Sequence, residues 1–318
     1  MKIYAGFDCG GSNTRCMLVS EDGVCLGVGK GGPSNYLFCG REVAAKSITD
    51  SMEQAFAQAG LENRPVEGIF IASAAVEVFH GQLHEDFFKE VTGCQKIECD
   101  SDIAPVWFAG SRFAPAIAMI AGTGAVTYLL KDRTFIKASG WGPQFGDEGS
   151  GFDVGIKAIR MTARMADFRV PMDEEFYDTV LAHYGVEKDN PRRLLRAVND
   201  GDFRSKAASV SREIDALYRA GNQTAKKLFE EAAEELFDSV RAVLSQAEGS
   251  YALVLSGGML RADSPLYELL MPKAQALSGI IKVELASVEA VRAAAAIALY
   301  KNGLEEASER LMKEGTVC

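Results

Sequence analysis

Residues 121–125 read Ala-Gly-Thr-Gly-Ala, and residues 140–151 read Gly-Trp-Gly-Pro-Gln-Phe-Gly-Asp-Glu-Gly-Ser-Gly. The first stretch is a glycine turn between two apolar runs, and the second is too rich in glycine to pack for its own sake. Because glycine loses much conformational entropy on folding, this density predicts left-handed backbone or close approach to a ligand. Turns that present backbone N–H groups in this way are suited to holding phosphate.

A near copy of the first turn lies close to the N-terminus, where residues 8–14 read Asp-Cys-Gly-Gly-Ser-Asn-Thr. The elements around the two turns repeat as well. Three short strands are predicted in each half, at 3–8, 14–20 and 24–30 and again at 116–121, 126–130 and 134–139. A helix follows each set, and strands and helices then alternate. Repetition of a whole set of elements predicts a duplicated α/β fold, with the two turns facing a cleft between two domains.

The length of 318 residues fits two domains, each with its own core. We expect an N-terminal domain at 1–113 and a C-terminal domain at 114–318. A long helical tract predicts a helical insertion into the second domain at about 167–247. The terminal helices, which follow residue 288, could instead pack on the first domain.

Composition excludes several classes of function. The net charge of −10 argues against a nucleic-acid partner, which would require a basic surface. No run of about 18 uncharged apolar residues predicts a membrane span, and Asp8 comes too early for a signal peptide. The seven cysteines are odd in number and form no CxxC pair, so we expect reduced thiols and a cytoplasmic protein.

Several weaker motifs favour ordinary structural roles. Residues 27–32 match GxGxxG, but Pro33 follows and no helix opens directly, so a dinucleotide site is not expected. His80 and His84 are four residues apart without an evident third metal ligand. His183 is interpreted as structural, and no histidine neighbours a serine or cysteine nucleophile in the sequence, so a hydrolytic triad has little support.

The acidic residues are the candidates for chemistry. Asp8 ends a buried strand, where a carboxylate needs a partner, and facing bound phosphates it would orient Mg²⁺. Asp100 and Asp102 follow a strand on the side where the turns should open. Either could be a helix cap, but phosphoryl transfer to an alcohol requires one carboxylate there to accept the hydroxyl proton. Asp147 and Glu148 are further acidic candidates.

Residues 8–14, 122–124, 141–150 and 255–258 together resemble the N-acetylglucosamine kinase and BadF-type ATPase family of the actin-like superfamily. The resemblance spans nearly the whole chain in the right order, and residues 141–150 are its most specific part. It implies an actin-like, ribonuclease H-like fold, with ATP and Mg²⁺ as cofactors. The implied substrate is an amino sugar, namely N-acetylglucosamine, N-acetylmuramate or glucosamine. A homodimer is an expectation at the level of the family.

The resemblance also implies roles by position. Asp102 matches the catalytic base better than Asp100. The phosphate contacts fall on Gly10, Gly11, Ser12, Asn13, Thr14, Gly122, Thr123 and Gly124, and the adenosine contacts fall on Gly257 and Gly258. The sugar contacts fall on Asn35, Ser73, Trp141 and Asp147. The chain departs from the family at Asn13, where a basic residue is common, at residues 74–75, where glycines are usual, and at 289–293, which lack the glycine that opens the last helix.

Two other functions remain as alternatives. A BadF-type activator of a radical dehydratase needs cysteine ligands for an iron–sulfur cluster in the second domain, which offers only Cys318, so the kinase is favoured. A nucleotide-binding regulator without catalytic activity stays open because of the departures from the family pattern.

Overall fold

The structure is a computed structural model that describes the chain except residues 11–12, 63–64, 74–75, 77–81, 133, 287 and 314–317, and the side chains of 37–38 and 82–84. The chain divides into two compact units. Unit 1 consists of Met1–Ala114 and Ala286–Cys318, and unit 2 consists of Pro115–Leu285. The terminal helices belong to unit 1, the alternative that the sequence left open, so unit 2 ends at Leu285 and not at residue 318.

Unit 1 contains a five-stranded mixed sheet with the order β3-β2-β1-β4-β5. Its strands are β1 (Ile3–Cys9), β2 (Thr14–Ser20), β3 (Cys25–Gly31), β4 (Gly68–Ser73) and β5 (Ile97–Ser101). β1 pairs antiparallel with β2 and parallel with β4, which pairs parallel with β5. The carboxyl ends of β1, β4 and β5 therefore meet at one edge of the sheet, where ligands of open α/β sheets usually bind.

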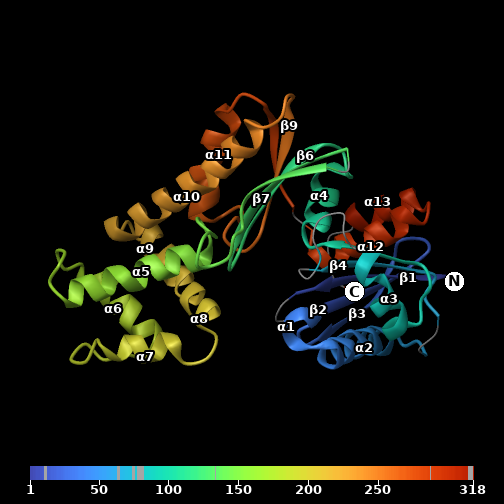
Figure 1. Ribbon diagram of the computed structural model, residues 1–318, viewed down its shortest axis with the longest axis horizontal. Helices are drawn as coiled ribbons and strands as arrows, with labels where there is room; N and C mark the ends of the chain where they lie inside the picture. Colours follow the sequence, from blue (N-terminus) through green and yellow to red (C-terminus); the bar gives the residue numbers. More distant parts are fainter. Residues whose placement is uncertain are drawn as a thin grey trace. The chain divides into compact units, whose positions relative to one another are not determined.

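Helices cover both faces of this sheet, as Figure 1 shows for α2 and α12. The helices of unit 1 are α1 (Tyr36–Cys39), α2 (Arg41–Gln58), α3 (Gln82–Thr92), α4 (Ile103–Ser111), α12 (Ala290–Lys301) and α13 (Glu305–Lys313). Alternation along β1 explains the two layers, because successive side chains of a strand point to opposite faces. Ala5 and Phe7 lie in the core beneath α2 and α3, whereas Tyr4 lies in the core with α12 and α13.

Three glycines of β3 allow α2 to lie directly against the strand. A Cβ atom on Gly27, Gly29 or Gly31 would lie 1.8–2.1 Å from a backbone oxygen of α2. Contact at that distance excludes every residue except glycine. Helix packing thus explains the first two glycines of the weak GxGxxG match, Gly27 and Gly29.

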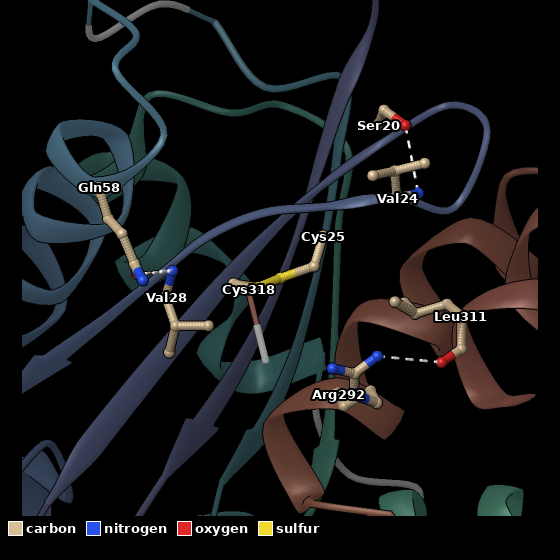
Figure 2. Close-up of a disulfide and its surroundings, with 8 residues drawn as sticks. All are labelled: Ser20, Val24, Cys25, Val28, Gln58, Arg292, Leu311 and Cys318. Carbon is tan, nitrogen blue, oxygen red and sulfur yellow. Dashed lines mark hydrogen bonds between the residues drawn. A yellow bond between two sulfur atoms is a disulfide. The ribbon is translucent and has the colours of Figure 1, made fainter. Parts of the chain in front are cut away.

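A disulfide ties the end of the chain to β3 (Figure 2). It joins Cys25 to Cys318, whose Cα atoms are 5.4 Å apart. Nearby, the buried Arg292 of α12 donates to the carbonyl of Leu311 in α13 at 3.3 Å. The expectation of reduced thiols was wrong for this pair, and it holds for the other five cysteines.

Unit 2 repeats the topology of unit 1, with the sheet order β10-β9-β6-β7-β8. Its strands are β6 (Ala116–Ala121), β7 (Ala125–Lys131), β8 (Thr134–Ser139), β9 (Tyr251–Ser256) and β10 (Ile280–Leu285). β6 pairs antiparallel with β7 and parallel with β9, as β1 does with β2 and β4. The prediction of a duplicated α/β fold is confirmed.

The helices of unit 2 are α5 (Gly151–Ala166), α6 (Glu174–His183), α7 (Arg193–Asn199), α8 (Phe203–Ser209), α9 (Ser211–Arg219), α10 (Gln223–Leu244) and α11 (Pro265–Ala276). α10 and α11 pack near the sheet, and α6 to α8 gather around α5 (Figure 1). One core runs from Ile117 and Leu253 of the sheet to Phe229 of α10. Among the described helices, none is long and apolar enough to cross a membrane.

Candidate active site

Asp8 lies at the carboxyl edge of the unit 1 sheet, in the same row as Ala72 of β4 and Asp100 of β5. Burial raises the pKa of Asp8 above its usual range, the charge of Asp102 raises it further, and Arg15 opposes the rise. Arg15 is the register partner of Asp8 on β2 and forms an ion pair with Glu289 at 3.2 Å. Arg15 therefore offsets part of the cost of this buried charge, and a bound cation would relieve it further.

Asp102 stands directly after β5, at the position that precedes α4. Its carboxylate makes no capping hydrogen bond to that helix, and it accepts instead from the Ser101 hydroxyl at 3.1 Å. The residue is exposed. Asp100, in contrast, accepts the Ser101 N–H at 2.7 Å and lies within the strand. Of the two aspartates, Asp102 is the one presented at the edge beyond the strand.

The first glycine turn joins β1 to β2, and its residues Gly11 and Ser12 lie outside the described residues. The Gly10 N–H donates to the carbonyl of Asn13 at 2.9 Å, and Asn13 is exposed. Thr14 is fully buried, with its hydroxyl 2.8 Å from Gly32 O and 2.6 Å from Ser34 Oγ. This hydroxyl therefore fastens the turn to the segment at 32–34. We do not assign the Thr14 side chain a contact with phosphate.

Two buried polar residues lie near this turn. Asn35 is 4 % exposed and follows Ser34, whose N–H donates to Gly10 O at 3.4 Å. Ser73 is fully buried at the end of β4, in register with Cys9 of β1. Asn35 and Ser73 thus flank the edge that carries Asp8. Residues 74–75, which depart from the family pattern, lie outside the described residues.

The second glycine turn, in unit 2, is fastened to the start of α5. The N–H groups of Gly151 and Phe152 donate to the carbonyls of Gly122 and Thr123 at 2.8 and 3.1 Å. Ser150 caps the helix by accepting the Asp153 N–H at 3.1 Å. Internal hydrogen bonds therefore hold this turn against the start of α5.

Asp147 is bound inside unit 2. It is 3 % exposed, has a φ of 61°, and forms an ion pair with Arg204 of α8 at 2.7 Å. Its other oxygen accepts the Ala125 N–H at 3.4 Å. A Cβ atom on Gly124 would lie 2.3 Å from Arg204 Nη2, which shows how closely the guanidinium approaches the turn. Sequence reasoning missed Arg204 because it lies 57 residues from Asp147, without a local motif.

The third glycine turn follows β9. Gly257 has a φ of 105°, and a Cβ atom there would lie 2.3 Å from the carbonyl oxygen of Ala121. Gly258 and Gly122 differ from it. Neither has a left-handed φ, and apart from its chain neighbours no atom of the described residues lies within 4 Å of the Cβ position of either one. A left-handed backbone and close protein packing therefore do not explain these two glycines, and both leave room for a ligand to approach the backbone.

Both glycines line one cavity of about 650 Å³ in unit 2. Thr123, α8, α9 and the start of α11 form much of the rest of its wall. Its volume lies within the range of small-molecule and cofactor sites. His183 also lines it, with Nε2 2.7 Å from Ser209 Oγ and Nδ1 3.5 Å from Glu213, so this histidine does contact a serine through the fold.

The two remaining predictions are Trp141 as a sugar contact and Asp8 as a residue that holds Mg²⁺. Trp141 is 78 % exposed on the glycine-rich loop. Among the described residues, no group of three or more His, Cys, Asp or Glu side chains could hold a metal ion by itself. Mg²⁺ is commonly held by one or two carboxylates together with substrate phosphates and water. Asp8, with its raised pKa, fits that kind of site.

Comparison with known proteins places the chain among sugar kinases and related ATPases. It is 28 % identical to the N-acetylmuramic acid/N-acetylglucosamine kinase of Clostridium acetobutylicum, over 84 % of this chain and 89 % of the relative. It is 26 % identical to the glucosamine kinase GspK of Vibrio cholerae, over 60 % of this chain and 64 % of the relative.

The fold is also that of a solved structure from Chromobacterium violaceum, a protein proposed to be an N-acetylglucosamine kinase. That structure matches with a TM-score of 0.76 at 24 % identity, over 94 % of this chain and 99 % of the other. Residues 5–298 match the family described as the BadF/BadG/BcrA/BcrD ATPase family. Because this match covers most of the sequence, the chain belongs to the BadF/BadG/BcrA/BcrD ATPase family.

Proposed function

We propose that this protein is an ATP-dependent kinase that transfers the γ-phosphate to a hydroxyl group of an amino sugar. The observation that carries the proposal is the cavity of unit 2, where Gly122 and Gly258 from two separate turns face the same space without a structural reason to be glycine. A nucleotide would approach both turns. The amino sugar is inferred from the names of the two kinase relatives, which act on N-acetylmuramic acid, N-acetylglucosamine or glucosamine.

Asp102 is the proposed catalytic base. Its exposed carboxylate would accept the proton of the sugar hydroxyl as that oxygen attacks the γ-phosphorus and ADP leaves. A positioned base of this kind contributes roughly 10²–10⁴ to the rate. Asn35, Ser73 and Trp141 are proposed to orient the sugar.

The phosphates are proposed to bind at the first turn, Gly10 to Asn13, and at the second, Gly122 to Gly124. Mg²⁺, when bound, would neutralise negative charge on the phosphates, and Asp8 would hold it or its water shell. The rest of the acceleration would come from positioning and electrostatic stabilisation, since phosphoryl transfer leaves the protein little covalent chemistry.

The alternative, an activator with an iron–sulfur cluster, is disfavoured by the positions of the cysteines. Unit 2 contains no cysteine in its sequence, and Cys318 is bonded to Cys25 within unit 1. A cluster requires thiolate ligands. Bound iron and a brown colour in protein purified without oxygen would favour the activator over the kinase.

The proposal is tested by coupled ADP release with N-acetylglucosamine, N-acetylmuramate, glucosamine and glucose. We expect turnover with at least one amino sugar and much less with glucose. Asp102→Asn should lower kcat by roughly 10²–10⁴ while ADP affinity stays unchanged. Asp100→Asn is the matched control, because its side chain accepts a hydrogen bond within the strand, and its kcat should stay within a few-fold of the parent. Equal turnover by the Asp102→Asn variant and the parent would remove Asp102 from the mechanism.

A further inference from the structure

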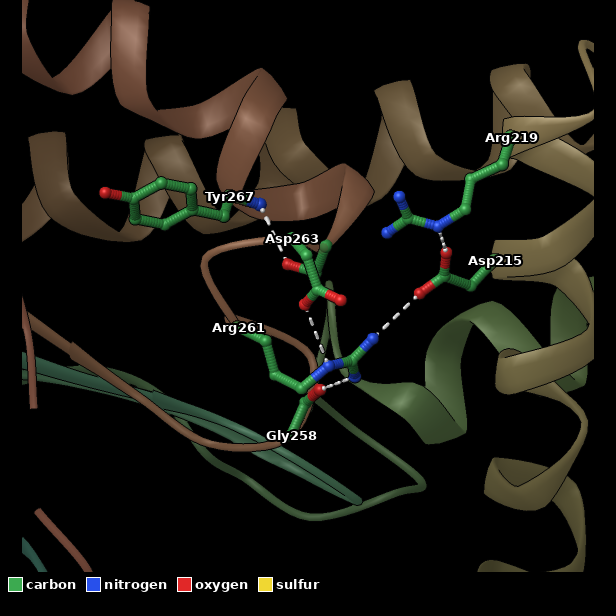
Figure 3. Close-up of polar contacts among 7 residues, drawn as sticks. Asp215, Arg219, Gly258, Arg261, Asp263 and Tyr267 are labelled. Carbon is green, nitrogen blue, oxygen red and sulfur yellow. Dashed lines mark hydrogen bonds and ion pairs between the residues drawn. The ribbon is translucent and has the colours of Figure 1, made fainter. Parts of the chain in front are cut away.

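Charged side chains from two walls of the unit 2 cavity meet beside the third glycine turn (Figure 3). Arg261 follows the turn, and its Nη1 donates to the carbonyl of Gly258 at 2.5 Å. Its Nη2 donates to Asp215 of α9 at 3.1 Å, and its Nε donates to Asp263 at 3.2 Å. Each of the three guanidinium nitrogens thus has its own acceptor.

Asp215 is the better anchored of the two acids. It is 14 % exposed, and its other oxygen accepts from Arg219 Nε at 2.7 Å, one helical turn further along α9. Asp263, by contrast, is 73 % exposed. An ion pair at a surface contributes little, whereas a partly buried carboxylate with two arginine donors is held in one place. The firm connection therefore runs from α9 through Asp215 and Arg261 to Gly258.

The connection through Asp215 and Arg261 holds one side of the Gly257–Gly258 turn. On one side of the turn, the Met259 N–H donates to the carbonyl of Ala121 at 3.0 Å, which fixes the turn to the end of β6. On the other side, Gly258 is exposed, and Arg261 fixes its carbonyl. Two consecutive glycines are the most flexible backbone a turn can have, so ordering them on ligand binding would cost conformational entropy. A turn that is already ordered avoids this cost.

We propose that Asp215 and Arg261 are positioning residues for the nucleotide: their ion pair joins the two walls of the cavity and holds the Gly257–Gly258 turn in the conformation that receives the ligand. This inference rests on the proposed binding of a nucleotide in the cavity. It gives the helical insertion, which supplies Asp215, a role in nucleotide affinity. Arginine is required rather than lysine, because an ammonium group cannot reach three acceptors in a planar arrangement.

The experiment measures ADP binding by calorimetry, and kcat with the KM values of ATP and sugar, for Asp215→Asn, Arg261→Gln, the double variant and Arg261→Lys. We expect each single variant to bind ADP roughly 5–30-fold more weakly, the loss that corresponds to one or two kcal/mol. The double variant should lose no more ADP affinity than the single variant that binds ADP less tightly. The reason is that all three variants break the same connection between Asp215 and Arg261. The KM of ATP should rise, while kcat and the KM of the sugar stay the same.

Glu234→Gln is the matched control. Glu234 of α10 forms an exposed ion pair with Lys273 of α11, so this variant also removes one acid that joins two helices of unit 2, but away from the cavity lining. Its ADP affinity should equal that of the parent. Thermal melting of every variant shows whether it is folded, and Arg261→Lys, on a half-exposed side chain, carries the test if Asp215→Asn does not fold.

The outcomes separate this inference from the proposed function. If the parent protein binds neither ATP nor ADP, the nucleotide cavity itself is refuted. If the parent binds and the folded variants bind equally well, only the positioning role is refuted. Variants that melt earlier but bind ADP with the parent's affinity would show that the ion pair serves stability alone, which also overturns the inference.

Discussion

Asp8 links the stability of unit 1 to pH and to the proposed metal. Burial and Asp102 raise its pKa above the ordinary value of 3.8. A raised pKa means that the folded state binds this proton more tightly than the unfolded state does. Stability from Asp8 is therefore fully present below the unfolded value and is lost as the pH rises through the folded value.

Asp8→Asn should accordingly raise the melting temperature of unit 1 at pH 7.5 and lower kcat. Asparagine carries no charge to bury, so the stability gap should close as the pH falls below the unfolded pKa. The same change should lower kcat about 10–100-fold, a range seen when a residue that orients a metal's ligands is removed. Melting curves from pH 3 to 8 and a magnesium titration of activity measure the two effects. A variant that melts below the parent at pH 7.5 would contradict the pKa argument.

Asp147 and Arg204 offer a second prediction, one that separates a structural role from a sugar contact. Arg204→Ala leaves the buried carboxylate of Asp147 without its cation and should cost about 1–3 kcal/mol in the stability of unit 2. The lower part of that range is expected because the Arg204 side chain is 43 % exposed. Asp147→Asn should cost less, since the amide oxygen still accepts the Ala125 N–H.

Urea unfolding of both variants measures this order of stability, with Arg169→Ala as the control. Arg169 pairs with Asp167 at the exposed end of α5, so its loss should stay within about 0.5 kcal/mol. The sequence predicts instead that Asp147 contacts the sugar. In that case Asp147→Asn would raise the KM of the sugar more than Arg204→Ala does.

At the scale of the elements, the contact between β3 and α2 depends on missing side chains. A Cβ atom on Gly29 would lie 1.8 Å from the carbonyl oxygen of Ser51, so α2 would have to move off the sheet. Gly29→Ala should cost at least about 1–3 kcal/mol, the range for overpacking a core. Gly32→Ala is the control, because its Cβ position is 3.2 Å from the side-chain oxygen of Ser47 and meets no other atom of the described residues within 4 Å beyond its chain neighbours. Melting temperatures that fall equally in the two variants would contradict this account.

The elements themselves were largely predictable, because their signals are local. Alternation and apolar runs gave β2, β6 and β8 with their observed bounds. The single-turn helix α1 was missed, since four residues cannot show a helical period. The long helical tract was recognised as helical, but its division into five helices depends on turns and caps that the apolar pattern does not show.

At the scale of the whole molecule, what the sequence could not show is which distant residues meet. The repeated order of strands and turns predicted the duplicated topology, and the glycines at 122 and 258 were identified as site residues. Asp215 and Arg261 were not, because they lie 46 residues apart and neither belongs to a motif. The sequence left open which unit holds the Ala-rich α12. Its backbone lies against Gly6 of β1, where a Cβ atom would fall 2.0 Å from Ala295 N.

The disulfide between Cys25 and Cys318 gives the last prediction, and it concerns the chain from end to end. The bridge spans 293 residues, so the ring that it closes contains all of unit 2. A cross-link lowers the entropy of the unfolded chain, and typical disulfides contribute about 2–4 kcal/mol. If unit 2 stays folded while unit 1 melts, the flexible part of the closed ring is shorter. The entropy lost on closing a loop depends only weakly on its length, so the stabilisation of unit 1 would be reduced only modestly.

Oxidised protein should therefore lose stability in unit 1 when a reductant is added, and Cys318→Ser should melt like the reduced parent in either condition. Cys39→Ser is the matched control, because Cys39 has a thiol that is not in the bridge, so this variant should keep the full response to reductant. Activity gives a second readout. The bridge joins β3 to the end of the chain and touches none of the proposed site residues, so kcat of the folded enzyme should not depend on it. An oxidised parent whose melting temperature ignores the reductant would show that the bridge adds nothing to the fold of unit 1.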